Sequence, residues 1–502
     1  MALRTRIAAG PLVAGALEGG AGGLSRPPPQ SIVILGGSGD LTRRKLLPAL
    51  YHLGVAGLLP EHYAVVGVSR SKLDPEGFRR WARACTESFC RCDVDAPNWR
   101  RFEAGLSHLS GDFGDPATFG RLAEHLGSLD RAHGTEGRRL FYLATPPSAF
   151  SEVIRGLGES GLARGSGVVV EKPFGRDAAS ARALNRALAD VFDEGRVFRI
   201  DHYLGKETVQ NLLVLRFANT IVEPLWNRRH VDHVQMTVAE DIGIEGRGSF
   251  YEEVGALRDM VQPHILQVLT FVAMEPPASL GADDLLAEKL KVLRAMRPVQ
   301  PSDVVRGQYL GYRSEPGVAA ASQTETFVAL RLEVENDRWA GVPFFVRTGK
   351  RLARRTSEIT VAFREPEIRI FGSARSERHG GNHLAIRIQP DEGISLSFLA
   401  KRPGAALELG EAALDFWYEP TFKSRLVEAY ERLLYDAMQG DRTLFTGAVG
   451  VERAWEILEP ALTDPPALHH YRPGSWGPVE ADALVAPRRW RVPGSTDRVR
   501  PR

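Results

Sequence analysis

The pattern of hydrophobic and polar positions changes once along the chain, near residue 200. Before that point, short apolar runs at 32–35, 63–69, 140–144 and 167–173 alternate with segments whose apolar residues recur at helical spacing. Apolar runs of this kind are typical of parallel strands that are covered by helices on both faces and joined by right-handed crossovers. The first part of the chain is therefore predicted to form an α/β domain with a parallel sheet.

After residue 200 many of the apolar residues recur at every second position. One apolar helix is expected at about 256–274. Apolar and polar residues alternate in six further segments, at 231–240, 327–335, 342–349, 358–365, 383–390 and 394–401. Alternating segments joined by short polar turns indicate an antiparallel sheet, so the second part is predicted to be an α+β domain.

The two ends of the chain differ from both parts. Residues 1–30 are rich in Gly and Ala and close with three prolines, which predicts a disordered tail. A signal peptide is the alternative, because Arg4 and Arg6 precede a mildly apolar run, although Gly and Pro interrupt that run. The Arg- and Pro-rich end is expected to fray. The predicted organisation is a tail at 1–30, an α/β domain at 31–200, an α+β domain at 201–485 and a second tail at 486–502.

Composition and charge narrow the class of protein. The 502 residues include 64 Lys and Arg against 62 Asp and Glu, with the two signs interleaved, so nucleic-acid binding has no support. No apolar run reaches the roughly 18 residues of a membrane-spanning helix. Cys85, Cys90 and Cys92 cannot pair completely, which argues against a disulfide framework and for a reducing cytoplasm. No metal site is expected, since no further ligand follows at zinc-site spacing.

A glycine turn follows the first predicted strand and opens a helix. It consists of Gly36, Gly37, Ser38, Gly39, Asp40 and Leu41. Such a turn lets backbone N–H groups approach a pyrophosphate at a helix N-terminus. The spacing is Gly-x-x-Gly rather than the full G-x-G-x-x-G, because Thr42 stands where the third glycine would be. A plain strand-to-helix turn is the alternative, but the position at the first strand of an α/β region favours dinucleotide binding.

The choice of dinucleotide should be set at the end of the second strand, where an acidic residue would bind the ribose 2′-OH of NAD. Here Val68 is followed by Ser69, Arg70, Ser71 and Lys72, without an acidic residue. A hydroxyl and two cations suit a 2′-phosphate, which favours NADP. Solvated surface charge is the alternative reading of the same residues.

Two further strand ends carry residues suited to a ligand, because ligands of open parallel sheets bind beyond the carboxyl ends of the strands. Lys172 follows one of these strands, and Pro173 fixes the backbone where the lysine must point. Ala144 and Pro146 end the preceding strand in a similar way. These positions are expected to face the cofactor, the substrate or both.

The densest group of reactive side chains lies at 199–206. It brings together Asp201, His202, Tyr203 and Lys206, and the last three can donate hydrogen bonds to a phosphate while the lysine supplies charge. A solvated loop would not explain why Tyr203 lies among the charges. His264, in the apolar helix, is by itself more often a core residue than a base. Pro263, directly before it, lacks an N–H and must therefore lie in the first turn of a helix or produce a kink.

Taken together, these segments resemble the glucose-6-phosphate dehydrogenase family from about residue 31 to about residue 482. The likeness rests on GGSGDL, FYLATPP, EKPFGRD, RIDHYLGKE, VQNLLVLRFAN, EGRGSFYEE, RDMVQPH, VPFFVRTGKRL and IRIQP, in this order. The resemblance implies a Rossmann-type domain followed by an α+β domain. It also implies NADP-linked oxidation of D-glucose 6-phosphate at C1, the first step of the oxidative pentose phosphate pathway, in a homodimer or homotetramer.

The resemblance further assigns roles to single residues. His264 matches the general base that takes the proton of the C1 hydroxyl, and Asp201 the carboxylate that holds the tautomer of that imidazole. The phosphate grip is matched by His202, Tyr203 and Lys206, with Arg355 as a further cation. The residues expected to bind the sugar are Lys172, Glu240, Asp259, Lys350 and Gln389. The residues expected to bind the cofactor are Gly36, Gly37, Ser38, Gly39, Asp40, Leu41, Arg70, Ala144, Pro146 and Lys172.

The sequence departs from the family pattern at three places. Pro263 stands where a small polar residue is usual, so we expect a bent helix beside the base. Thr356 and Thr360 replace cations of a second, structural NADP site, and Phe113 replaces a tyrosine near the cofactor. Two alternatives remain: a sugar oxidoreductase of the glucose–fructose oxidoreductase type, which would act on free glucose, and an NADP-sensing protein, which would bind the cofactor without turnover.

Overall fold

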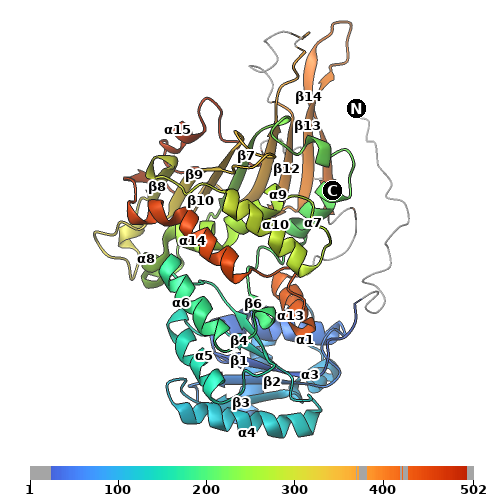
Figure 1. Cartoon of the computed structure of the whole chain (residues 1–502), viewed down its shortest axis with the longest axis vertical. Coiled ribbons are helices and arrows are strands. Elements are labelled where there is room, and N and C mark those ends of the chain that lie inside the picture. The colour runs from blue at the N-terminus through green and yellow to red at the C-terminus, as the bar shows by residue number, and fades with distance from the viewer. Residues whose placement is uncertain (1–23, 369, 372–380, 419–420, 422–427, 495–502) are drawn as a thin grey trace. The chain divides into compact units, whose positions relative to one another are not determined.

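The computed structural model describes residues 24–368, 370–371, 381–418, 421 and 428–494 (Figure 1). The chain divides into two compact units. Unit 1 comprises Met1–Gly175, Arg182–Gly205 and Glu419–Ala448, and unit 2 comprises Arg176–Ala181, Lys206–Tyr418 and Val449–Arg502. The expected boundary at residue 200 lies close to the break at Gly205, but the second unit is not continuous.

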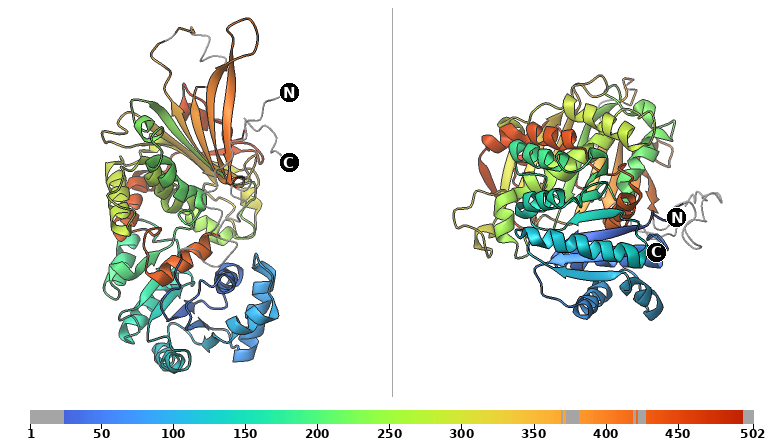
Figure 2. Two further views of the ribbon diagram at one scale, coloured as in Figure 1. Left: turned by 90° about the vertical axis from the view of Figure 1, so that its right-hand side faces the viewer. Right: turned by 60° about the horizontal axis from the view of Figure 1, so that its bottom comes forward.

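Unit 1 contains a six-stranded sheet in the order β3-β2-β1-β4-β5-β6, in which every pairing is parallel. Its strands are β1 (Gln30–Leu35), β2 (Tyr63–Ser69), β3 (Leu106–Ser110), β4 (Arg139–Leu143), β5 (Gly167–Val170) and β6 (Val197–Arg199). Residues 32–35 and 168–170 are no more than 1% exposed because helices cover both faces of the sheet (Figure 2). The predicted parallel α/β fold is confirmed.

The helices of this region follow the expected crossovers between parallel strands. They are η1 (Thr42–Leu46), α1 (Leu47–Val55), α2 (Pro75–Phe89), α3 (Ala96–Glu103), α4 (Pro116–His133), η2 (Pro147–Ala149), α5 (Phe150–Glu159), α6 (Ala178–Ala189) and η3 (Glu194–Arg196). A further helix, α13 (Ala429–Gln439), returns from far along the sequence and packs on α1. A Cβ atom at Gly205 would lie 3.0 Å from the carbonyl oxygen of Ala429, so the chain passes closely against α13.

Unit 2 contains a nine-stranded sheet in the order β14-β13-β12-β11-β7-β10-β9-β8-β15. The strands are β7 (Val231–Ala239), β8 (Val304–Tyr309), β9 (Phe327–Glu333), β10 (Pro343–Gly349), β11 (Thr356–Phe363), β12 (His383–Gln389), β13 (Gly393–Lys401), β14 (Leu409–Trp417) and β15 (Leu468–Tyr471). Most pairings are antiparallel, as predicted, but β10 runs parallel to β7 and β15 runs parallel to β8.

The helices of unit 2 include a nearly continuous apolar pair. The helical elements are α7 (Glu207–Phe217), η4 (Glu223–Leu225), α8 (Gly248–Ala256), η5 (Leu257–Ile265), α9 (Leu266–Ala273), α10 (Ala282–Ala295), η6 (Pro301–Asp303), η7 (Tyr312–Ser314), α14 (Ala448–Thr463) and α15 (Ala481–Val485). The apolar helix expected at 256–274 corresponds to η5 and α9, with η5 wound as a π-helix. Among the described residues, no helix is both long and apolar enough to cross a membrane.

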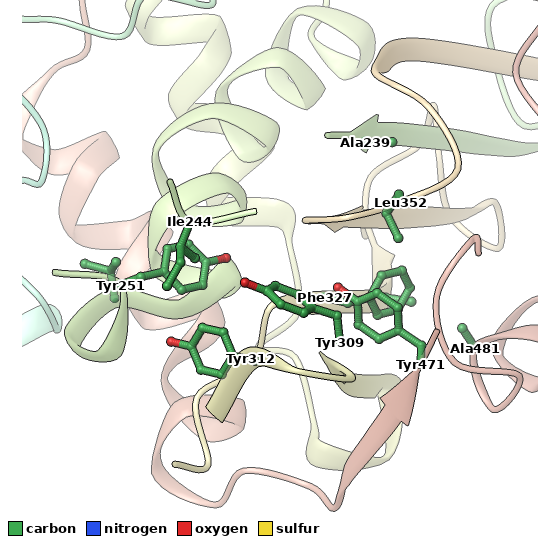
Figure 3. Close-up of a cluster of buried hydrophobic side chains, with 11 residues drawn as sticks. Ala239, Ile244, Tyr251, Tyr309, Tyr312, Phe327, Leu352, Tyr471 and Ala481 are labelled. Atoms are coloured by element: carbon green, nitrogen blue, oxygen red, sulfur yellow. The ribbon is translucent and has the colours of Figure 1, made fainter. Parts of the chain in front are cut away.

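An aromatic cluster lies at one end of the sheet of unit 2 (Figure 3). The rings of Phe327 and Tyr471 meet edge to face at 5.6 Å, and those of Tyr309 and Tyr312 at 5.4 Å. Such pairs contribute about 0.5–1.5 kcal/mol beyond the burial of their area. The Tyr471 hydroxyl also donates to the backbone oxygen of Lys350 at 2.7 Å. The cluster therefore fixes the chain just after β10.

Parts of both expected tails are packed. Residues 1–23 and 495–502 lie outside the described residues, but the carbonyl oxygen of Ser25 accepts a hydrogen bond from the Tyr435 hydroxyl at 2.9 Å. At the other end, Arg488 forms a two-point ion pair with Asp232, at 2.7 and 3.0 Å. The expected fraying from residue 486 is thus wrong for 486–494. An Arg- and Pro-rich composition does not reveal that one of its cations has a partner far away in the sequence.

Trp490 makes the C-terminal segment a testable stabilising element. Its ring faces the guanidinium of Arg347 at 4.8 Å, and Trp476 faces the same group at 4.8 Å. Burial lowers the pKa of Arg347 to about 10. Trp490→Ala removes one of the two rings, so we expect a loss of about 2 kcal/mol, seen as a melting midpoint lower by a few degrees. Arg489→Ala, at an exposed neighbouring side chain, is the control; equal midpoints in the two variants would contradict the prediction.

Candidate active site

The glycine turn of unit 1 is required by close backbone packing. Gly36 has φ +103°, and a Cβ atom there would lie 2.4 Å from the carbonyl oxygen of Ala144. A Cβ atom at Gly37 would lie 2.4 Å from the Cα of Gly67. Side chains at either position are therefore excluded. Thr42 stands where the third glycine would be, and its buried hydroxyl donates to the oxygen of Gly36 at 2.9 Å.

The end of β2 lies beside this turn. The hydroxyls of Ser38 and Ser71 are 2.9 Å apart, which places the residue after Arg70 against the glycine turn. Arg70 itself is exposed. Asp40 at the start of the helix binds Arg43 and Arg44, at 2.8 and 2.9 Å. Burial acts to raise the pKa of Asp40, but these hydrogen bonds outweigh it and lower the pKa.

Ser71 was not among the residues predicted to bind the cofactor. The sequence places Ser71 in the polar run after β2. Its contact with Ser38 becomes visible only in the structure, where this run lies beside the glycine turn. Ala144 and Pro146 follow β4 as expected, and the amide of Ala144 donates to the oxygen of Leu35 at 2.8 Å. Lys172 is half-buried just beyond β5. The predicted cofactor residues of unit 1 therefore follow the carboxyl ends of neighbouring strands.

Asp201 is held in a tight turn after β6. It is 1% exposed, and its carboxylate accepts a hydrogen bond from the amide of Tyr203 at 2.9 Å. Arg199, also 1% exposed, donates to the carboxylate of Glu194 at 2.7 and 3.0 Å and fixes the strand that precedes the turn. His202 follows with its ring 5.1 Å from that of Tyr203. The turn thus presents an acid, an imidazole and a phenol in a fixed arrangement.

Unit 2 gathers three of the five predicted sugar-binding residues, Glu240, Asp259 and Lys350, into one charged cluster. Lys350, only 3% exposed, forms an ion pair with Glu240, and its ammonium lies 4.0 Å from the carboxylate of Asp259. The ammonium also lies 5.6 Å from the ring centre of Tyr251. Burial raises the pKa of the Tyr251 phenol, and the charge of Asp259 adds to this effect. Two carboxylates, an ammonium and a neutral phenol can bind several hydroxyls of a sugar.

A second group in unit 2 joins Lys206 to Gln389. The Lys206 ammonium donates a hydrogen bond to the side-chain oxygen of Gln389, and Thr208 donates to the oxygen of Ile388 at 3.3 Å. These bonds tie the start of α7 to the end of β12. Arg355 is exposed directly before β11.

The helical segment around His264 is wound as a π-helix. Pro263 has no N–H, and its ring would clash with the carbonyl four residues earlier in an α-helix. In η5 the turn widens, and the amide of Leu266 donates to the oxygen of Val261, five residues back. The amide of Leu257 donates to the Glu325 carboxylate at 3.1 Å and secures the start of η5. His264 is fully buried in this segment.

The chain has close relatives among known proteins. Residues 33–211 match the sequence model of the family described as glucose-6-phosphate dehydrogenase, NAD binding domain, and residues 213–491 match that of its C-terminal domain. Glucose-6-phosphate 1-dehydrogenase 2 of Mycobacterium tuberculosis H37Rv is 46% identical over 488 residues, which cover 93% of this chain and 95% of the relative. Glucose-6-phosphate 1-dehydrogenase of Chlamydia pneumoniae is 42% identical over 501 residues, which cover 94% and 98%.

Solved structures show the same likeness. The crystal structure of glucose-6-phosphate 1-dehydrogenase from Mycobacterium avium is similar with a TM-score of 0.85 at 41% identity, covering 93% of this chain and 99% of that one. A glucose-6-phosphate dehydrogenase in complex with its substrate glucose-6-phosphate is similar with a TM-score of 0.86 at 34% identity, with the same coverage.

Proposed function

The chain belongs to the glucose-6-phosphate dehydrogenase family, and from that premise we propose how its residues carry out the reaction. The reaction oxidises D-glucose 6-phosphate at C1 to 6-phospho-D-glucono-1,5-lactone. NADP⁺ accepts the C1 hydride. The observation that carries this conclusion is that the two family models match the chain from residue 33 to residue 491.

The residues after β1 and β2 fit NADP. The glycine turn stands at the start of a helix, and the lack of side chains at Gly36 and Gly37 lets the backbone pack closely there, as in turns that bind a pyrophosphate. Beyond β2 the exposed Arg70 can form paired, charge-assisted hydrogen bonds with a 2′-phosphate. Ser71, fixed by Ser38, is an additional donor. We assign these residues to the cofactor, together with Ala144 and Pro146.

We assign the proton transfer to His264. A buried imidazole that is neutral can take the proton of the C1 hydroxyl as the hydride leaves, which prevents positive charge from developing on the sugar. The carboxylate assigned to hold the tautomer of this imidazole is Asp201, whose own position is fixed by the amide of Tyr203. The cluster of Glu240, Asp259 and Lys350 is assigned to the sugar hydroxyls.

The phosphate is assigned to His202, Tyr203 and Lys206, with Arg355 as an exposed cation. Gln389, bonded to Lys206, and Lys172 are assigned to the substrate as well. A direct assay tests the whole assignment of function: NADPH formation followed by absorbance, with glucose 6-phosphate or free glucose as substrate and NADP or NAD as acceptor. Turnover of free glucose alone, or NADP binding without turnover, would contradict it.

Arg70 gives a prediction about the cofactor. Arg70→Ala should raise KM for NADP by about tenfold and leave KM for NAD nearly unchanged, because only NADP carries the 2′-phosphate. The expected size is at the lower end of the range for charged hydrogen bonds, since Arg70 is exposed and screened by solvent. Both cofactors are titrated at saturating glucose 6-phosphate, with Arg80→Ala, on the exposed face of α2, as the control. Equal losses for NADP and NAD would mean that Arg70 supports the loop or the adenine.

We also propose that the protein acts in the cytoplasm as a homodimer or homotetramer. The support for assembly through the large sheet is that β14 is an edge strand with Leu414 exposed. Edge strands present unpaired N–H and C=O groups to a partner. Light scattering coupled to gel filtration measures the assembly, and a monomer at micromolar concentration would contradict the proposal.

A further inference from the structure

The start of η5 has no capping residue of its own. The preceding helix α8 breaks at Gly255, which has φ +60° and ψ −179°. Ala256 then stands at the N-cap of η5, and alanine has no side-chain acceptor for the amides of a helix start. The first amides after the break are nevertheless satisfied, by a residue that lies far away in the sequence.

That residue is Glu325, two positions before β9. Its backbone oxygen accepts a hydrogen bond from the amide of Ala256 at 3.0 Å, and its carboxylate accepts one from the amide of Leu257 at 3.1 Å. Glu325 is 5% exposed, and a Cβ atom at Gly255 would lie 2.5 Å from its carboxylate oxygen. The glycine therefore leaves the space that the carboxylate occupies, and Glu325 caps η5 from outside the helix.

A buried cation is the partner of this carboxylate. Arg306, on β8, is 8% exposed, and its guanidinium donates to Glu325 at 3.4 Å. It also donates to the backbone oxygens of Gln323 and Pro466, at 2.5 and 3.0 Å. A buried carboxylate is costly unless it is paired and hydrogen-bonded. The Leu257 amide and Arg306 each donate to one carboxylate oxygen, so Glu325 is held in place on both sides.

The residue after Glu325 holds the other side of the charged cluster. The backbone oxygen of Thr326 accepts a hydrogen bond from the amide of Lys350 at 2.9 Å. Asp259 lies in the first turn of η5, and its carboxylate is 4.0 Å from the Lys350 ammonium. Thr326 leads into Phe327, which packs in the aromatic cluster (Figure 3). Two consecutive residues of one rigid segment thus hold both the start of η5 and the backbone of Lys350.

We propose that Glu325 is a positioning residue, which fixes the start of η5 relative to Lys350. The residues placed by this contact are Asp259, in the first turn of η5, and His264, near its end. The inference rests on the roles proposed above for these residues in sugar binding and proton transfer. Groups that are held in the productive arrangement reduce the entropy lost on binding, and a displacement of about 1 Å can cost about 100-fold in rate.

Two substitutions separate the hydrogen bond of Glu325 from its charge. Glu325→Gln keeps an oxygen within reach of the Leu257 amide, so we expect kcat and KM for glucose 6-phosphate to stay within about threefold. Glu325→Asp keeps the charge, but its side chain is shorter by one methylene and the amide loses its acceptor. In Glu325→Asp we expect kcat/KM for glucose 6-phosphate to fall roughly 10- to 100-fold, with KM raised at least about threefold.

KM distinguishes positioning from a merely structural role. A smaller folded fraction lowers the apparent kcat, but it leaves KM for glucose 6-phosphate unchanged. KM for NADP should not change, because the residues assigned to the cofactor lie in unit 1. A lower melting midpoint with an unchanged KM for glucose 6-phosphate in Glu325→Asp would overturn the proposal, and so would equal losses in Glu325→Gln and Glu325→Asp.

Gly255→Ala tests the same contact from its other side. The added Cβ atom would displace the Glu325 carboxylate, so we expect the same rise in KM for glucose 6-phosphate. Even if Glu325→Asp fails to fold, an unchanged KM in Gly255→Ala would overturn the proposal. The matched controls are Glu333→Gln and Glu333→Asp, at the other end of β9, where the carboxylate pairs with Arg297 and Arg331. Both control variants should have unchanged kcat and KM.

A variant of Asp259 distinguishes the inference from its premise. Asp259→Asn should raise KM for glucose 6-phosphate by itself. If it does so while Glu325→Asp and Gly255→Ala leave that KM unchanged, the positioning role is overturned and the proposed function stands. If Asp259→Asn changes neither kcat nor KM, the role assigned to Asp259 fails, and the positioning role that rests on it fails with it.

Discussion

Replacing His264 by Asn should lower kcat by about 10²- to 10⁴-fold, with a much smaller change in KM for glucose 6-phosphate. Asn has a similar polar shape but no nitrogen that can accept the proton of the C1 hydroxyl at neutral pH. His264 is fully buried within the π-helical segment. His264→Asn therefore removes the group that accepts the proton and leaves the protein surface unchanged. The measurement is the rate of NADPH formation at saturating substrate and cofactor.

Two further variants place limits on this prediction. Asp201→Asn should cost less than His264→Asn, because it affects the orientation and tautomer of the base rather than the base itself. His230→Asn, at an exposed histidine of the same unit, should leave kcat unchanged. An unchanged kcat in His264→Asn would show that His264 is not the base. Another group of the site would then have to accept the proton.

Much of unit 1 could be predicted from local sequence. The apolar run at 32–35 and the glycine turn after it are consecutive in the chain, and a parallel sheet follows from strands that alternate with helices. The positions of the residues that we assign to the cofactor were predictable for the same reason, since they lie just beyond strands whose ends can be read from the sequence. Ser71 is an exception, because its contact with Ser38 depends on how two strands are aligned.

The parts that were not predicted depend on partners far away in the sequence. Helix α13 belongs with unit 1 although more than 200 residues separate it from Gly205. The parallel pairing of β7 with β10 joins segments about a hundred residues apart. Periodicity shows which face of an element is apolar, but not which distant element covers that face.

Pro263 is a different case. The sequence shows that the helix must change at this proline, but it does not show which form the change takes. The missing N–H predicted a first turn or a bent helix beside the base. The structure shows a widened, π-helical turn over η5, from which the helix continues into α9. A π-helical turn is rare enough that sequence alone does not favour it, although such turns are frequent at functional sites.

Replacing Lys206 by Ala should raise KM for glucose 6-phosphate roughly 10- to 100-fold and leave kcat/KM for free glucose nearly unchanged. Hydrogen bonds to charged groups contribute about 1.5–3 kcal/mol, and only the phosphorylated sugar offers Lys206 a charged partner.

Lys206 stands at the N-cap of α7, where a cation opposes the helix dipole, and its ammonium donates to Gln389 at the end of β12. Lys206→Ala removes both the unfavourable and the favourable interaction, so we expect only a small change in the melting midpoint. Lys291→Ala, at an exposed lysine of α10, is the control for a lost positive charge. Equal losses for glucose 6-phosphate and free glucose would show that Lys206 acts on the sugar or through Gln389, to which its ammonium donates, rather than on the phosphate.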